Sequence, residues 1–179
     1  MLILKRQHIF LIGLSGSGKS TVGKILAKKL KRTFVDIDKM IERNTGKSII
    51  RIFEEDGEPS FRKMETVAIG KVARKFSRPK VVALGGGAFE SSANQKLIIA
   101  SGISIWLRCP INELSKRMKS NSDRPLLKGP DLKRRLSSQL KNRISNYRKA
   151  DLQLSFARKT PGQVSGEIIT MLNKKYAAN

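Results

Sequence analysis

Hydrophobic positions along the chain fall into short apolar runs that alternate with longer stretches of helical spacing. The apolar runs cover residues 9–12, 33–37, 81–84, 103–107 and 152–156. Each run has the length of a buried strand, and between the runs apolar residues recur three or four positions apart, as in Val22, Leu26 and Leu30. The alternation predicts an α/β fold of three layers (αβα), with helices on both faces of a five-stranded parallel sheet.

The length of the chain, 179 residues, fits one domain with one core, so we expect residues 1–179 to form a single domain. No apolar run approaches the roughly 18 residues that a membrane span requires, and the first residues lack the features of an export signal. Cys109 is the single cysteine and cannot form an internal disulfide, which suits a reducing compartment. We therefore expect a soluble, cytoplasmic protein that does not contact a membrane.

The charge of the chain changes this picture, because 37 basic residues against 14 acidic ones give a formal net charge of +23. The excess is concentrated in residues 108–149, which hold thirteen basic and three acidic residues. Such a surface attracts anions, either phosphate and carboxylate ligands or a nucleic acid. For a single residue of this set, a solvated helix face is the simpler interpretation.

A glycine-rich motif follows the first apolar run and reads Gly-Leu-Ser-Gly-Ser-Gly-Lys-Ser over residues 13–20. This is the P-loop pattern, and it stands between a strand and a helix, as a P-loop does. Its backbone N–H groups cradle phosphates, its lysine reaches the β- and γ-phosphate oxygens, and its last hydroxyl binds Mg²⁺. The predicted ATP contacts in this segment are Gly13, Ser15, Gly16, Ser17, Gly18, Lys19, Ser20 and Thr21.

Two aspartates at the end of the second apolar run, Asp36 and Asp38, are predicted to lie at the carboxyl edge of the sheet, where ligands bind. Asp36 could hold Mg²⁺ through a water, which makes Ser20 and Asp36 the candidate metal site. Asp38 could accept a hydrogen bond from a substrate hydroxyl. The local pattern fits equally well with a cap and first-turn charge for a helix that begins near Lys39.

Two further patterns have both a functional and a structural interpretation. Glu58, Arg62 and Glu65 share one helix face, so the carboxylates could preorganise the arginine for a substrate carboxylate or simply stabilise the helix. Residues 85–87 are three consecutive glycines after the third run, where a backbone could approach a ligand closely or make a tight turn. Residues 120–131 contain few apolar residues and are predicted to form a mobile loop between two helices.

Six motifs in order resemble those of the shikimate kinase family. They read GxxGxGKS, FxDxD, FxxxGExxFRxxE, a strand ending in GGG, RPLL and RxxxYxxxAD, and together they cover nearly the whole chain. The resemblance implies a small αβα kinase with a P-loop core. It also implies a helical substrate-binding segment at about residues 38–65 and a mobile lid at about residues 118–131.

The resemblance further implies a reaction, the transfer of the γ-phosphate of ATP to the 3-hydroxyl of shikimate, and it implies residue roles. Asp38, Arg62, Gly86 and Arg143 would contact shikimate, while Lys19, Ser20 and Asp36 would serve ATP and Mg²⁺. Arg124 would meet the phosphates from the lid, and Arg117 would stack on the adenine. Lys19, Asp38 and Arg124 are then the predicted catalytic residues.

Other functions remain open at this stage. A P-loop is shared by many enzymes, so a gluconate kinase or a nucleoside monophosphate kinase is the nearest alternative. A nucleic-acid-binding P-loop ATPase would use the basic surface, but the chain has one Trp and two Tyr and lacks a basic stripe interleaved with aromatic residues. We therefore expect ATP and shikimate as the partners, no specific nucleic acid, and a monomer.

Overall fold

The computed structural model describes residues 7–74, 78–119 and 131–176. The predicted lid falls almost entirely outside these residues, and so does Arg124. The two helices that flank the lid in the sequence are described, α6 (Ile111–Lys119) and α7 (Leu132–Tyr147). Among the described residues, no helix combines the length and the apolar character that a membrane crossing requires.

Five parallel strands form one sheet in the order β2-β3-β1-β4-β5. Their bounds are β1 (His8–Ile12), β2 (Thr33–Asp36), β3 (Lys80–Ala83), β4 (Gly102–Arg108) and β5 (Leu152–Ser155). All five residues of β1 are buried, since this strand is paired on both sides and covered on both faces. The predicted five-stranded parallel sheet is confirmed.

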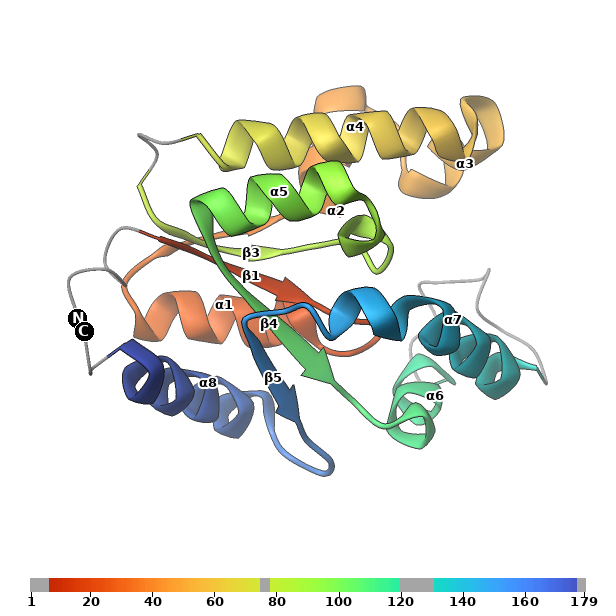
Figure 1. Ribbon diagram of the computed structural model, residues 1–179. Helices are drawn as coiled ribbons and strands as arrows, with labels where there is room; N and C mark the ends of the chain where they lie inside the picture. Colours follow the sequence, from red (N-terminus) through yellow and green to blue (C-terminus); the bar gives the residue numbers. More distant parts are fainter. Residues whose placement is uncertain (1–6, 75–77, 120–130, 177–179) are drawn as a thin grey trace.

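Helices cover both faces of the sheet, which gives three layers (Figure 1). On one face, α1 (Lys19–Lys29) packs beside α8 (Pro161–Tyr176). On the other face, α4 (Gly57–Val72) packs beside α5 (Ser92–Ser101). The short helices α2 (Ile37–Thr45) and α3 (Ile49–Glu55) pack on α4 and complete the predicted substrate-binding segment.

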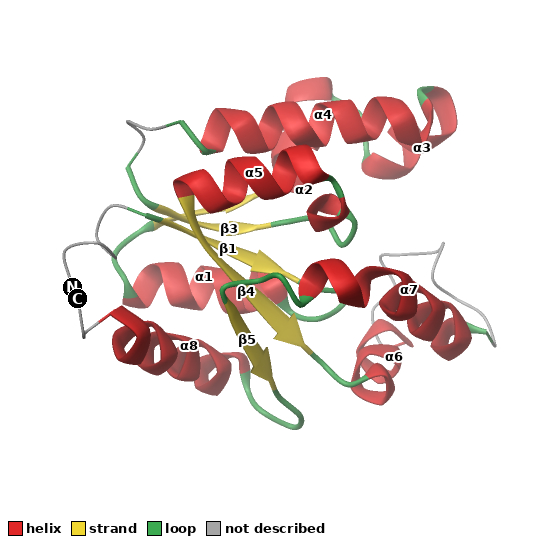
Figure 2. Ribbon diagram, in the orientation of Figure 1, coloured by secondary structure: helices red, strands yellow, loops and turns green. Residues whose placement is uncertain are grey.

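The chain leaves the carboxyl end of each strand through a loop or directly into a helix, and these junctions hold the candidate site (Figure 2). The P-loop follows β1, Asp36 ends β2, and the three glycines follow β3 before the one-turn helix η2 (Ala88–Glu90). Helix α7 also contacts η2. Because the strands are parallel, segments from distant parts of the sequence meet at this one edge.

His8 at the start of β1 has a structural role. Its side chain is buried, and its Nδ1 atom accepts a hydrogen bond from the backbone N–H of Lys80 at 3.1 Å. Burial, together with the nearby charges of Lys80 and Arg32, lowers the pKa of His8 to about 4. The histidine therefore stays neutral in the folded protein at neutral pH.

Candidate active site

Two glycines of the P-loop have backbone conformations that are unfavourable for a residue with a side chain. Gly13 has φ +140°, and a Cβ atom there would come within 2.8 Å of the Leu107 carbonyl oxygen. Gly18 has φ +86° and forms the N-cap of α1. Both positions therefore require glycine, and they direct the loop from β1 into the helix amino terminus. This is the strand-loop-helix geometry in which a P-loop holds phosphates.

Lys19 spans the P-loop from the first turn of α1. Its Nζ atom donates to the carbonyl oxygens of Gly13 at 2.8 Å and Leu14 at 2.9 Å, and its side chain is buried. These two contacts hold the ammonium over the loop, at the place where the motif requires a cation. A phosphate that enters the loop would replace these carbonyl oxygens as the partner of the Lys19 ammonium.

Ser20 and Asp36 meet beside the P-loop. The Ser20 hydroxyl donates to Oδ2 of Asp36 at 2.6 Å, although sixteen residues separate them. A hydroxyl and a carboxylate next to a phosphate-binding loop suit Mg²⁺, which takes few protein ligands and keeps several waters. Accordingly, no cluster of three or more His, Cys, Asp or Glu side chains exists in the described part of the chain. The pair fits the predicted metal.

The placement of Asp38 corrects one sequence-based interpretation. Strand β2 ends at Asp36, and α2 already begins at Ile37 rather than near Lys39, so Asp38 lies in the first helical turn and not on the strand. The reason is local, because Oδ1 of Asp36 accepts a hydrogen bond from the backbone N–H of Lys39 and caps the helix. Asp36 therefore combines both of its predicted roles, as cap and as partner of Ser20.

Asp38 and Glu65 approach each other over Gly85. A Cβ atom on Gly85 would lie 2.5 Å from Oε1 of Glu65 and 3.1 Å from Oδ1 of Asp38. The Glu65 side chain is fully buried, and burial raises its pKa, although the charge and hydrogen bond of Arg62 lower it. The missing side chain of Gly85 thus makes room for two carboxylates of the protein itself.

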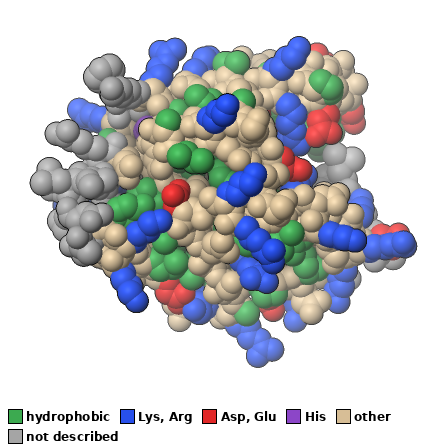
Figure 3. Space-filling model, in the orientation of Figure 1, with side chains coloured by type: hydrophobic (Ala, Val, Ile, Leu, Met, Phe, Trp, Pro, Cys, Tyr) green, Lys and Arg blue, Asp and Glu red, His purple; other side chains and the backbone are tan. Residues whose placement is uncertain are grey.

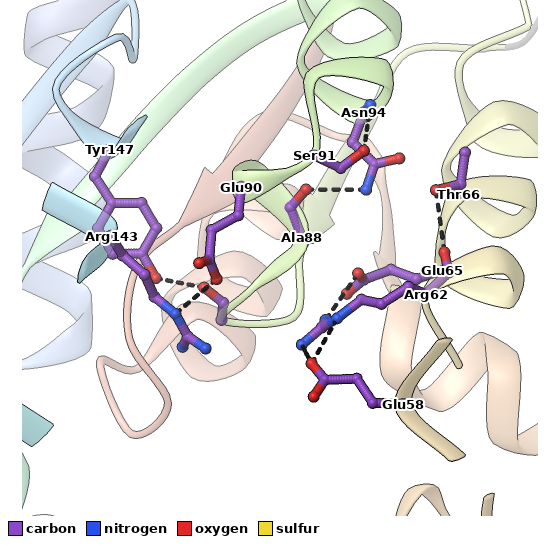
Figure 4. Close-up of polar contacts among 11 residues, drawn as sticks. Glu58, Arg62, Glu65, Thr66, Ala88, Glu90, Ser91, Asn94, Arg143 and Tyr147 are labelled. Carbon is purple, nitrogen blue, oxygen red and sulfur yellow. Dashed lines mark hydrogen bonds and ion pairs between the residues drawn. The ribbon is translucent and has the colours of Figure 1, made fainter. Parts of the chain in front are cut away.

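Arg62 is fixed on α4 by the two carboxylates that its helical spacing predicts (Figure 4). Its Nε and Nη2 atoms donate to Oε1 of Glu58 at 3.1 and 2.8 Å, and its Nη1 atom donates to Oε2 of Glu65 at 3.0 Å. A Cβ atom on Gly87 would lie 2.7 Å from Nη2 of Arg62. The guanidinium is therefore preorganised against the loop after β3.

Arg143 on α7 faces the same loop from the opposite side (Figure 4). Its Nε atom lies 2.7 Å from Oε1 of Glu90 in an ion pair. Nearby, the Tyr147 hydroxyl donates to the carbonyl oxygen of Gly86, and burial raises the pKa of this tyrosine to about 12. Arg143 thus reaches the site beside a neutral, buried tyrosine and an acidic residue of another element.

A cavity of about 320 Å³ separates the two arginines. Its lining residues are Glu58, Arg62, Thr66, Gly87, Glu90, Ser91, Asn94 and Arg143. This volume lies at the lower end of the range for small-molecule sites. Two of the four predicted acceptor contacts, Arg62 and Arg143, line it.

The other two predicted acceptor contacts, Asp38 and Gly86, do not line this cavity, but they stand close to it. Asp38 is placed over Gly85, as described above. A Cβ atom on Gly86 would lie 3.2 Å from Nη1 of Arg143 and 3.4 Å from the backbone nitrogen of Ser15 in the P-loop. Gly86 therefore lies between the P-loop and the cavity.

Arg117 on α6 lies beside the P-loop. Its guanidinium stands over the ring of Phe156, with 5.7 Å from Cζ to the ring centroid. Its Nη1 atom is 3.8 Å from the Cβ position of Gly18. The structure therefore places Arg117 next to the phosphate-binding loop.

Sequence analysis did not identify Glu90 or Tyr147 as site residues. Glu90 follows the glycines by three residues and belongs to no motif, so nothing in the sequence marks it as a partner of Arg143. Tyr147 could have been identified, since it lies four residues after Arg143 and therefore on the same helix face.

Comparisons with known proteins identify the family of this chain. The family model for shikimate kinase matches residues 15–173. The shikimate kinase of Sulfurihydrogenibium sp. (strain YO3AOP1) is 40% identical over 169 residues, which cover 94% of this chain and 99% of the relative. The solved structure of shikimate kinase from Acinetobacter baumannii in complex with shikimate is 32% identical, covers 98% of this chain and 97% of its own, and superposes with a TM-score of 0.90.

A gluconokinase from Sinorhizobium meliloti 1021 is similar in fold alone. It is 18% identical, covers 97% of this chain and 95% of its own, and superposes with a TM-score of 0.65. The three-layer arrangement is therefore shared with kinases that act on other acceptors, so the fold alone does not decide the acceptor.

Proposed function

The chain belongs to the shikimate kinase family and is an ATP-dependent small-molecule kinase, and we propose that it transfers the γ-phosphate of ATP to the 3-hydroxyl of shikimate. The observation that carries this assignment is the pair of arginines on separate elements, Arg62 and Arg143, that line one small cavity beside the P-loop. Two guanidinium groups suit a carboxylate, which they bind through planar, paired hydrogen bonds. Shikimate has such a carboxylate and hydroxyl groups on one ring.

On the ATP side, the P-loop backbone would hold the phosphates, with Lys19 on the β- and γ-phosphate oxygens. Ser20 and Asp36 would hold Mg²⁺, which neutralises phosphate charge when it is bound. Arg117 would lie against the adenine, since its guanidinium already stands over the ring of Phe156 and an adenine ring offers a similar face. Arg124, outside the described residues, would meet the phosphates from the lid.

On the acceptor side, Arg62 and Arg143 would hold the carboxylate, and Gly86 would allow the ring to approach the backbone beside the P-loop. Asp38 would orient the 3-hydroxyl toward the γ-phosphate and accept its proton. Phosphoryl transfer depends mainly on alignment and on stabilisation of phosphate charge, so we assign Asp38 to positioning first and to base catalysis second. Lys19 and Arg124 would stabilise the charge of the transferred group.

The wider organisation that we propose is a single kinase domain over residues 1–179. Within it, residues 38–65 form the substrate-binding segment, and residues 118–131 form a lid that completes the site on closure. We further propose that the enzyme acts as a monomer in the cytoplasm, in the pathway to chorismate and the aromatic amino acids. Lys and Arg side chains are scattered over the described part of the face seen in Figure 3, and we expect no specific nucleic acid as a ligand.

A coupled assay of ADP release tests the proposal. The enzyme is given ATP and Mg²⁺ with shikimate, and in parallel with gluconate, nucleoside monophosphates or single-stranded nucleic acid. We expect ADP release that depends on shikimate, with a stoichiometric phosphorylated product by mass spectrometry. Release with gluconate or a nucleotide in place of shikimate would overturn the acceptor, and stimulation by nucleic acid alone would favour the ATPase alternative.

A further inference from the structure

Glu90 is in direct contact with an arginine of the acceptor cavity, yet the function proposed above gives it no role. It is the last residue of η2, and its Oε1 atom lies 2.7 Å from Nε of Arg143. Arg143 is mostly buried, with 18% of its side chain exposed, so its orientation depends on a small number of protein groups. The ion pair with Glu90 bears on the orientation of the guanidinium, together with a hydrogen bond between the side chains of Arg143 and Tyr147.

The short helix that carries Glu90 is itself rigidly held. The backbone N–H of Glu90 donates to the Gly87 carbonyl oxygen at 3.0 Å, and Ala88 and Phe89 are buried in the core. The buried amide of Asn94 donates to the Ala88 carbonyl oxygen at 2.9 Å. The Glu90 backbone is therefore fixed relative to the end of β3, and its carboxylate has a defined starting point.

A second tie joins this short helix to α7, which carries Arg143. The Nε2 atom of Gln95 lies 2.7 Å from the Phe89 carbonyl oxygen and 3.2 Å from Oδ1 of Asn146. The Tyr147 hydroxyl adds a bond from α7 to the Gly86 carbonyl oxygen. The distance between η2 and α7 is thus held by contacts other than the ion pair, so the ion pair can act on the direction of the Arg143 side chain.

The atom that Glu90 contacts is informative. A guanidinium has five N–H groups, and a bond at Nε occupies the side nearest the aliphatic stem. The two terminal nitrogens form the edge that can bind a carboxylate through two parallel hydrogen bonds. A carboxylate on Nε therefore leaves this terminal edge available to a ligand, and Arg143 lines the cavity with Nη1 3.2 Å from the Cβ position of Gly86.

From these contacts we propose that Glu90 is a positioning residue, which orients Arg143 so that its terminal nitrogens bind the carboxylate of the acceptor. The inference rests on the proposed role of Arg143. It differs from a second possibility, in which Glu90 is only a counterion that competes with the acceptor for the guanidinium. Positioning requires the reach of the Glu90 side chain, whereas competition requires its charge.

Two matched substitutions distinguish the effect of the length of the Glu90 side chain from the effect of its charge. Glu90→Gln keeps the length and an acceptor oxygen for the Nε–H group but removes the charge, and Glu90→Asp keeps the charge but shortens the reach. If Glu90 positions Arg143, Glu90→Asp should raise the KM for shikimate about 3- to 10-fold, and Glu90→Gln should change it less than about twofold. The kcat and the KM for ATP should stay within about twofold in both variants.

A double-mutant cycle with Arg143→Ala shows whether the effect passes through the arginine. In the Arg143→Ala background, Glu90→Asp should change the KM for shikimate less than about twofold. Melting temperatures of all variants, measured without ligand, identify any loss of folding. If Glu90→Asp does not fold, Glu90→Ala takes its place with the same expected rise in KM.

The outcomes separate this inference from the proposed function. If Arg143→Ala itself leaves the KM for shikimate unchanged, the proposed role of Arg143 fails and the positioning role fails with it. If Arg143→Ala raises the KM but Glu90→Asp does not, only the positioning role is overturned. A lower KM in Glu90→Gln would also overturn it, since a competing counterion predicts that result.

Discussion

The two sides of the cavity differ in their balance of acidic and basic residues and in the partners of their arginines. The α2–α4 side, residues 36–65, holds eight acidic and six basic residues, whereas the α6–α7 side, residues 108–149, holds three acidic and thirteen basic residues. On the first side, Arg62 takes both carboxylate partners from its own helix. On the second side, Arg143 takes its partner from Glu90, outside the basic stretch. One arginine is thus positioned locally and the other by tertiary structure.

This difference matches the two ligands that we propose. The acceptor has one negative charge and needs an arginine in a fixed direction, which internal ion pairs provide. ATP has several negative charges and gains from an excess of cations around its phosphates. The two sides are therefore expected to respond differently to substitution, to pH and to salt.

The largest effect should come from Asp38, which we place at the reacting hydroxyl. Asp38→Asn removes the charge and proton acceptor but keeps the size, so kcat should fall by about 10²-fold or more. ATP binding should be close to normal, because the P-loop is untouched. Steady-state kinetics and nucleotide binding by calorimetry measure the two effects, and turnover near the normal rate would remove Asp38 from the mechanism.

Arg62 and Arg143 should respond alike in binding but differently in stability. Replacing either with Ala should weaken shikimate binding by about 2–4 kcal/mol, as expected for a desolvated carboxylate pair. Only Arg62→Ala should also lower the free energy of unfolding, by about 2–3 kcal/mol, because it leaves the fully buried Glu65 without its ion pair. In Arg143→Ala, Glu90 is 38% exposed and water can solvate it.

Glu65→Gln supplies the control for this contrast. Added to Arg62→Ala, it replaces the buried carboxylate with a neutral amide, so most of the lost stability should return while shikimate binding stays weak. Denaturant unfolding and shikimate titration measure the two quantities. Equal losses of stability in Arg62→Ala and Arg143→Ala would contradict the distinction between the two sides.

The contrast between these arginines also explains how far the sequence was informative. The partners of Arg62 were predictable, because residues at i−4 and i+3 meet on any helix. The pairing of Arg143 with Glu90 joins residues 53 positions apart, and it exists only because β3 and α7 meet at the edge of the sheet. The start of α2 was predicted near Lys39 rather than at Ile37, because the capping of α2 by Asp36 depends on backbone geometry that the apolar pattern does not show.

The surroundings of the three glycines after β3 were also predicted only in part. Their sequence predicted a close approach of a ligand or a tight turn. The structure confirms the turn, in which the backbone N–H of Ala88 donates to the Gly85 carbonyl oxygen at 3.1 Å, and it places side chains of the site itself in the space beside the glycines. Glu65 and Asp38 approach Gly85, Arg143 approaches Gly86, and Arg62 approaches Gly87. The strands, by contrast, were predictable, since short continuous apolar runs are sufficient to identify the centre of a parallel sheet.

At the opposite end of β1, His8 should make stability depend on pH without affecting either ligand. Its pKa is about 4 in the folded protein against 6.5 unfolded, so the unfolded state binds more protons between these values. Stability should therefore be lost as pH falls from about 6.5 to 4, by at most about 3 kcal/mol from this group. His8→Gln should flatten this part of the profile in unfolding measured by circular dichroism, and an unchanged slope would contradict the assignment.

A change in salt concentration should affect the KM values for ATP and shikimate differently, and this is the smallest of the expected effects. Raising the ionic strength from about 0.05 to 0.5 M shortens the screening length several-fold, so long-range attraction of ATP to the α6–α7 side should weaken. We expect the KM for ATP to rise about 3- to 5-fold and the KM for shikimate, which depends on fixed contacts, to rise less than about twofold.

Charge removal on each side tests the source of this salt effect. Lys133 and Arg134 are exposed on α7, and Lys24 and Lys28 are exposed on α1. Replacing the first pair with Gln should reduce the salt dependence of the KM for ATP more than replacing the second pair, although each change removes two positive charges. Equal reductions would mean that the net charge of the whole protein, rather than the basic stretch beside the site, attracts the nucleotide, and the difference between the two sides would then be limited to their arginines.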